Sequence, residues 1–177
     1  MFMGQWFNPC DTVAVAMSCT VAGGFMGGGG SNALLKRASA MKAEVVLLDA
    51  DKVCGVDHLL SAVLHARRAF QRGENASNTL SMEVILYASG ERQISKAKKK
   101  MGLHQGTERV AVVLLSSGDI EETLSDLDLR RDDSLLECTA EKAAAFGVRP
   151  SELETMGERY RQELVLEKVA FVDLLKR

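Results

Sequence analysis

The apolar positions of the chain fall into two patterns, short continuous runs and longer segments with helical spacing. The runs contain many β-branched residues and are bounded by polar or glycine-rich turns, which is typical of strands. They predict three strands, at Thr12–Val21, Glu44–Asp49 and Arg109–Leu115. Apolar residues recurring every three or four positions predict helices, at Ser31–Lys42, Asp57–Arg72, Thr79–Ala88, Glu91–Met101, Asp119–Leu127 and Tyr160–Lys176.

These elements together predict a single α/β domain. The pattern of Asp132–Ala145 fits an edge strand followed by a helix. We therefore expect a small mixed or antiparallel sheet of three to four strands, covered by six to seven helices. The domain spans residues 12–177, after a loose leader at residues 1–11. The six glycines of Gly23–Gly30 predict a flexible loop inside it.

Two of the predicted helices carry basic side chains opposite their apolar face. In Asp57–Arg72 the apolar face is formed by leucine, valine, alanine and phenylalanine, and in Glu91–Met101 by Ile94, Ala97 and Met101. The opposite faces carry Arg68 and Arg72 in the first helix, and Arg92, Lys96 and Lys99 in the second. Such stripes keep a helix solvated, but a polyanion would also relieve the repulsion between neighbouring like charges.

The distribution of charge strengthens this interpretation, although the chain as a whole has a net charge of only −2. Residues 65–109 contain nine basic and four acidic residues, a net charge of +5. Residues 116–163 contain thirteen acidic and six basic residues, a net charge of −7. A basic region beside an acidic one fits either two solvated faces or a surface that binds phosphate groups.

Two polar turns, Gly73–Asn75 and Ser89–Gln93, flank the predicted helix Thr79–Ala88. Backbone N–H groups at a helix start can bind phosphate, and arginine and glutamine side chains can fork onto base edges. We expect the two basic helices to meet at these turns and to bind a few unpaired nucleotides. The predicted contact residues are Arg68, Arg72, Asn75, Ser89, Gly90, Arg92, Gln93, Lys96 and Lys99.

The last predicted helix, Tyr160–Lys176, is apolar nearly all round its axis. A helix on the surface of a globular protein normally shows one apolar stripe. This helix is therefore either fully buried, or buried on one side and exposed to a partner on the other. If it binds a partner, the contact residues are Leu166, Ala170 and Leu174, on a surface separate from the RNA-contact residues.

Cysteine spacing and hydropathy limit the class of protein. The cysteines at positions 10, 19, 54 and 138 form no CxxC pair, so we expect reduced, mostly buried thiols and no metal site. No stretch is long and apolar enough to span a bilayer, and the apolar segment Thr12–Met26 lacks a preceding Lys or Arg. These features predict a cytoplasmic protein that is not bound to a membrane.

The run Met82–Val113, which contains ASGERQI, resembles the small regulatory subunit of the KEOPS complex, the family of the p53-related kinase-binding protein. The resemblance extends through the DAD and GEN segments of Leu48–Leu80 and returns at Glu167–Lys176, so it covers most of residues 44–177. It implies an α/β domain without catalytic residues or cofactor. It also implies binding of the single-stranded 3′ CCA end of tRNA, through Asn75, Ser89, Gly90, Arg92 and Gln93, and docking on the atypical kinase/ATPase subunit.

Two alternatives compete with this interpretation. One is a protein-interaction regulator of the kinase that does not bind RNA. The other is a nucleotide-binding enzyme, because a strand, the Gly23–Gly30 loop, a helix and a strand ending at Asp49 imitate the start of a dinucleotide-binding fold. The glycines fit neither GxGxxG nor GxxxxGK[ST], however, which favours a loop without nucleotide.

Overall fold

The computed structural model describes residues 19–157 and 160–175. Its centre is a four-stranded antiparallel sheet in the order β2-β3-β1-β4. The strands are β1 (Thr20–Met26), β2 (Val45–Asp49), β3 (Arg109–Leu114) and β4 (Leu129–Arg131). The predicted α/β class and the predicted number of strands are therefore confirmed, and the sheet is antiparallel rather than mixed.

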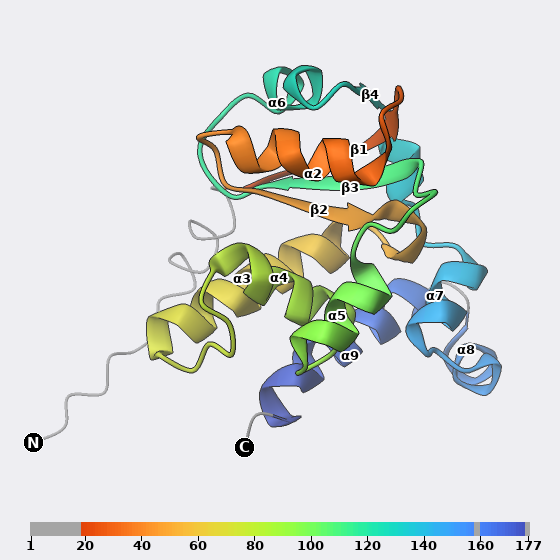
Figure 1. Ribbon diagram of the computed structural model, residues 1–177. Coiled ribbons are helices and arrows are strands. Elements are labelled where there is room, and N and C mark those ends of the chain that lie inside the picture. Colours follow the sequence, from red (N-terminus) through yellow and green to blue (C-terminus); the bar gives the residue numbers. More distant parts are fainter. Residues whose placement is uncertain (1–18, 158–159, 176–177) are drawn as a thin grey trace, which may run out of the picture.

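Helices cover both faces of the sheet (Figure 1). One face packs against α2 (Gly30–Ala40) and α6 (Ile120–Asp126), whereas α3 (Val56–Arg72), α4 (Leu80–Ser89) and α9 (Arg161–Leu175) lie on the other. The remaining elements are α5 (Ile94–Met101), α7 (Ala140–Phe146), α8 (Pro150–Met156) and two 3₁₀ turns, η1 (Ala50–Lys52) and η2 (Asp133–Leu136).

Strand β3 shows why this sheet needs two covering layers. Its side chains alternate between the faces, so that Val110 and Val112 pack with Leu34 of α2. Ala111 and Val113 instead join the larger core formed with α3, α4 and α9. All four side chains are fully buried, which is why the run reads as continuously apolar in the sequence.

The prediction of a flexible loop over Gly23–Gly30 is partly wrong. Gly23 and Gly24 lie within β1, paired with Ala111 and Val110 of β3. Gly23 is a glycine because the chain after β4 passes close by: a Cβ atom there would lie 2.3 Å from the carbonyl oxygen of Asp132. The leader and the part of the predicted strand Thr12–Val21 that precedes Cys19 lie outside the described residues.

The sheet topology also removes the basis of the nucleotide-binding alternative. A dinucleotide-binding fold begins with two parallel, adjacent strands joined by a helix. Here β3 lies between β1 and β2 and is antiparallel to both. The glycines before α2 therefore occupy a different position in a different kind of sheet.

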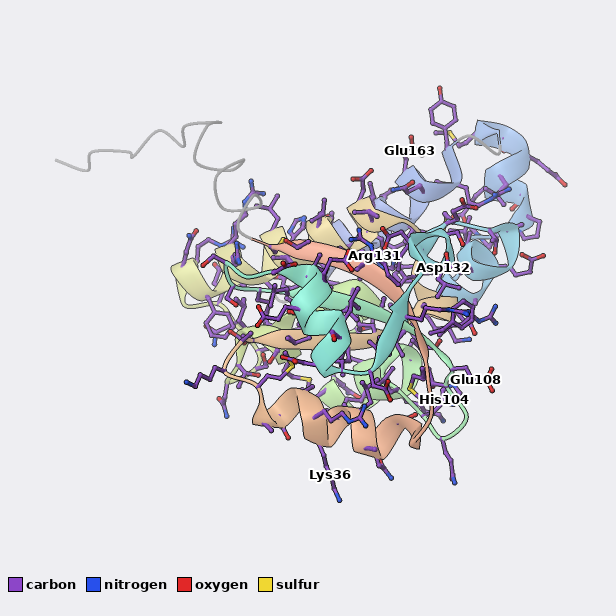
Figure 2. The ribbon with its side chains drawn as sticks, turned by 90° about the horizontal axis from the view of Figure 1, so that it is seen from above. Lys36, His104, Glu108, Arg131, Asp132 and Glu163 are labelled. Carbon is purple, nitrogen blue, oxygen red and sulfur yellow. A yellow bond between two sulfur atoms is a disulfide. The ribbon has the colours of Figure 1, made fainter. Side chains whose placement is uncertain are left out.

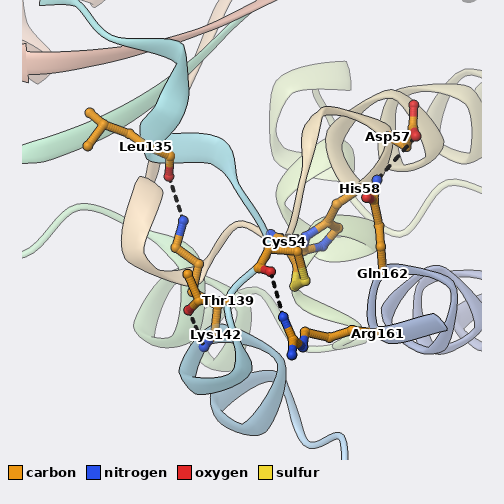
Figure 3. Close-up of a disulfide and its surroundings, with 9 residues drawn as sticks. Cys54, Asp57, His58, Leu135, Thr139, Lys142, Arg161 and Gln162 are labelled. Atoms are coloured by element: carbon orange, nitrogen blue, oxygen red, sulfur yellow. Dashed lines mark hydrogen bonds between the residues drawn. A yellow bond between two sulfur atoms is a disulfide. The ribbon is translucent and has the colours of Figure 1, made fainter. Parts of the chain in front are cut away.

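The expectation of reduced cysteines is wrong for one pair. Cys54 and Cys138 form a disulfide across 84 residues, linking the segment before α3 to the segment before α7. Arg161 and Gln162, at the start of α9, reach toward the same place (Figure 3). Arg161 donates a hydrogen bond to the Cys138 carbonyl, at 3.2 Å, and Gln162 donates to the Asp57 carboxylate, at 3.1 Å. The disulfide and these two hydrogen bonds together hold the beginnings of α3, α7 and α9 close to one another.

Within residues 19–157 and 160–175, the structure contains no helix with the length and apolar character needed to cross a bilayer.

Candidate functional site

The turn between α4 and α5 has a well-defined backbone. Gly90 ends α4 in the left-handed conformation, with φ at 70°. Its N–H donates to the Tyr87 carbonyl and the Glu91 N–H to the Leu86 carbonyl, the pattern of a Schellman cap. The Ser89 side chain is fully buried, and its hydroxyl donates to the Leu86 carbonyl at 2.9 Å. Ser89 therefore shapes the turn with its hydroxyl, and the RNA contact of this residue stays a prediction.

The exposed side of this turn continues into α5. Arg92, Gln93, Lys96 and Lys99 are all exposed, while the apolar face of α5 is buried through Ala97 and Met101. Gln93 is the N-cap residue, and its side chain does not cap the helix. The first-turn N–H groups of α5 thus lie beside the exposed side chains of Arg92, Gln93 and Lys96, and Lys99 follows one turn later. The predicted apolar face is confirmed for Ala97 and Met101 but not for Ile94, which is 39% exposed. We call the four exposed residues Arg92, Gln93, Lys96 and Lys99 the α5 surface.

The basic stripe of α3 lies elsewhere. The Nη2 atom of Arg72 is 3.7 Å from a carboxylate oxygen of Asp173 in α9, and its Nε donates to Glu74 at 2.7 Å. His65 hydrogen-bonds the same Asp173 carboxylate at 2.9 Å, and Arg68 is half-buried. The expected continuous basic surface across α3 and α5 is therefore wrong, because α9 packs along the polar side of α3.

Asp173 is the centre of a polar cluster that the sequence pattern does not predict. It accepts hydrogen bonds from the Tyr87 hydroxyl and from His65, whose ring stacks on Tyr87. Burial opposes ionisation of Asp173, but the hydrogen bonds from Tyr87 and His65 outweigh it and lower its pKa. Burial, together with the hydrogen bond to Asp173, raises the pKa of Tyr87 far above its ordinary value. The cluster fixes α9 against α3 and α4.

The turn that contains Asn75 lies at the other end of α4. The buried Glu83 carboxylate holds it, accepting hydrogen bonds from the N–H groups of Ala76 and Ser77 and from the Ser77 hydroxyl. The side-chain amide of Asn75 donates to the Ser77 carbonyl at 2.9 Å. The ten residues of α4, roughly 15 Å of helix, separate this turn from Gly90. The prediction that the two turns meet is wrong.

Helix α9 is buried on one side and exposed on the other. Val165, Val169 and Val172 are fully buried, whereas Phe171 is 49% and Leu174 60% exposed. Ala170 is also exposed, and Leu166 is half-buried. Glu163 projects outward near the start of the same helix (Figure 2). The residues predicted for partner binding, Leu166, Ala170 and Leu174, thus share one outward stripe, which we call the α9 stripe.

The α5 surface and α9 are neighbours. A Cβ atom on Gly90 would lie 3.8 Å from the Lys168 carbonyl oxygen of α9 and 3.6 Å from the Phe146 ring of α7. The turn that precedes α5 therefore packs directly against the helix that carries the α9 stripe. The sequence interpretation had treated these as separate surfaces.

His58 supports the turn from within the core. Its Nδ1 accepts a hydrogen bond from the Cys54 N–H at 3.0 Å, and its Nε2 lies 2.8 Å from the Ala88 carbonyl. Since a carbonyl can only accept, the proton must be on Nε2. Burial lowers the pKa of His58 to about 4, so this imidazole is neutral near pH 7.

Comparison with known protein families gives a match. The sequence profile of a family described as kinase binding protein CGI-121 matches residues 30–148, which is more than half of the chain. The matched range runs from α2 to the end of α7, and so it includes the α5 surface but not α9. A search of curated proteins found no match.

Proposed function

The chain belongs to the CGI-121 family of kinase-binding proteins, and on this premise we propose that it is the tRNA-end-binding accessory subunit of the KEOPS complex. Family membership makes it a non-catalytic kinase-binding protein. The proposed role adds two contacts in the cytoplasm. The α5 surface and the Gly90 turn bind the single-stranded 3′ CCA end of tRNA, and the α9 stripe docks on the kinase/ATPase subunit.

The observation that carries the RNA contact is the exposure of the α5 surface at an uncapped helix start. Arg92 and Gln93 offer forked N–H donors suited to base edges. The N–H groups that follow Gln93 can donate hydrogen bonds to a phosphate oxygen. A single-stranded tail suits this surface better than a duplex does, because α5 is only eight residues long and Arg92, Gln93 and the first-turn N–H groups lie together at its start.

The lysines of α5 supply the sequence-independent part of the binding. Lys96, Lys98 and Lys99 are exposed on one short helix, and no acidic residue lies in its first turn. Binding of phosphate groups releases counterions, so the affinity falls as the salt concentration rises. Two to four phosphate contacts predict a slope of log K against log salt of roughly −1.4 to −2.8.

The α9 stripe supports the kinase contact. Apolar side chains as exposed as Phe171 and Leu174, adjacent on one helix face, are typical of protein interfaces. The inner side of α9 is held by the valine core and by the Asp173 cluster. A partner can therefore bind the outer side without unpacking the helix.

A second candidate function is a kinase-binding regulator without RNA binding. The specific observation in its favour is that Arg72 is engaged with Asp173 and Glu74, so the basic surface is smaller than the sequence indicated. The two functions differ in one measurable property, the affinity for a tRNA tail.

A gel-shift experiment separates them. Intact tRNA and the same tRNA trimmed of CCA are titrated with wild-type protein and with Arg92→Glu, and Lys36→Glu serves as the control. Lys36 projects from α2, on the side of the molecule away from α9 (Figure 2). The proposal expects binding that is lost on trimming and on Arg92→Glu, and kept in the control. Equal binding of both tRNAs contradicts tail recognition, and no binding of either favours the regulator without RNA.

A further inference from the structure

Lys168 occupies a position on α9 that differs from the α9 stripe. At 100° per residue it lies roughly 120° from Leu174 and 160° from Ala170 around the helix axis. Asp173 lies on the opposite flank, where it contacts α3 and α4. The Lys168 side chain is 35% exposed, and the backbone carbonyl of the same residue packs against the Gly90 turn.

A second lysine reaches the same turn from α5. Lys100 donates a hydrogen bond to the Ser89 carbonyl at 2.7 Å, and its Nζ lies 4.3 Å above the centre of the Phe146 ring. Phe146 also contacts the position of Gly90. One lysine from α5 and one from α9 therefore border the Gly90 turn, which packs on the Phe146 ring.

The acidic neighbours of these lysines neutralise them only weakly. Glu91 lies 3.9 Å from Lys100, and Glu152 lies 4.0 Å from Lys168, both at the outer limit of an ion pair. The Glu152 carboxylate is already occupied, because the N–H and the guanidinium of Arg149 donate to it at 2.7 Å and 3.3 Å. Partly exposed ion pairs at such distances contribute little stability.

The local electrostatics also favours an anion. Burial lowers the pKa of Lys100, Glu91 opposes the shift, and the nearby positive charge of Lys168 adds to it. Two like charges close to each other, with incomplete hydration, gain free energy when an anion binds between them. A phosphate group has the charge and the multiple acceptor oxygens to accept hydrogen bonds from both ammonium groups.

We propose that Lys100 and Lys168 form a phosphate-binding notch beside Gly90, which extends the RNA-contact surface from α5 onto α9. The inference rests on the proposed function and adds a contact to it. When the bases of an RNA strand contact Arg92 and Gln93, a phosphate group of its backbone binds in the notch. The notch lies on a different flank of α9 from the α9 stripe, so tail and kinase can bind at the same time.

The notch is tested with Lys168→Gln, which removes the charge, and Lys168→Arg, which keeps it. Affinity for intact tRNA is measured over a range of salt concentrations, with Lys36→Gln as the charge-matched control on α2. Loss of one phosphate contact makes the slope of log K against log salt shallower by about 0.7. Between 50 and 200 mM salt, the loss of affinity is then roughly threefold smaller for the variant than for wild type. We expect this reduction in Lys168→Gln, and wild-type slopes in Lys168→Arg and in the control.

Two further measurements make the outcome decisive. The thermal unfolding midpoint of each variant shows that the fold is retained, and Arg92→Gln reports on the α5 surface independently. If Arg92→Gln weakens binding while Lys168→Gln keeps the wild-type affinity and slope, the notch is refuted and the proposed function stands. If wild-type protein does not bind the tail at all, the RNA part of the proposed function fails and the notch fails with it.

Discussion

Protonation of His58 is expected to destabilise the protein in a measurable pH window. The imidazole lies fully buried between the start of α3 and the end of α4, and hydrogen bonds to Cys54 and Ala88 use both of its nitrogens. An imidazolium would lose the bond from Cys54, because its Nδ1 would carry a proton and could no longer accept. Because Ala88 directly precedes the turn at Ser89, protonation of His58 destabilises the structure next to that turn.

The magnitude follows from the pKa shift. Burial is the main cause of the decrease in the pKa of His58 from 6.5 to about 4. Because the unfolded chain binds the proton more readily, His58 stabilises the fold fully above pH 6.5 and progressively less as the pH falls toward 4. A shift of that size corresponds to about 3 kcal/mol of unfolding free energy.

The assay is urea unfolding of wild type and His58→Gln at pH values from 4 to 8. Glutamine does not titrate, and the other titrating groups, including Asp173, cancel in the difference between the two proteins. The difference in unfolding free energy should be constant above pH 6.5. Below it, wild type should lose about 3 kcal/mol relative to the variant by pH 4. Parallel curves over the whole range would show that His58 is not a buried neutral imidazole.

Three other predictions address the docking helix, the disulfide and the Asn75 turn. Leu174→Asp should weaken kinase binding at least tenfold, seen by titration calorimetry, without lowering the unfolding midpoint; unchanged affinity would remove the α9 stripe as the docking surface. Reductant, or Cys138→Ser, should lower the unfolding free energy by about 4.5 kcal/mol, the value for a loop of this length. Equal stability in oxidising and reducing buffer would contradict the disulfide. Glu83→Ala should lower the free energy of unfolding by about 3 kcal/mol, measured with denaturant, since it leaves buried donors without an acceptor. A decrease below 1 kcal/mol would show that Glu83 does not hold the Asn75 turn.

The sequence predicted the elements whose signal is local. The apolar run Val110–Leu114 predicted a buried strand, and it forms most of β3. The helical spacing of Ala97 and Met101 predicted that the lysines of α5 lie on its exposed face. The apolar segment near the C-terminus also predicted α9, but it left open whether one side of this helix is exposed, and the structure shows that it is. Each of these predictions depends on a few neighbouring positions and on the geometry of one element.

The failures all concern contacts between distant segments. Gly23 and Gly24 look like loop residues, but the chain after β4 passes too close to allow a side chain at Gly23. Nothing in the spacing of Cys54 and Cys138 shows that two segments 84 residues apart come together. The polar side of α3 looked solvent-exposed because the partner of His65 and Arg72, Asp173 in α9, lies about a hundred residues later.

The most direct test of the account is to map what the 3′ end of tRNA contacts. A photoreactive group on the terminal adenosine is cross-linked to the wild-type protein, and the attached peptide is identified by mass spectrometry. A probe in the anticodon loop serves as the control. The account predicts cross-links within Ser89–Lys100, reduced by Arg92→Glu, and none from the anticodon probe to that segment. Cross-links only to α2 or α6, on the opposite face of the sheet, would contradict it.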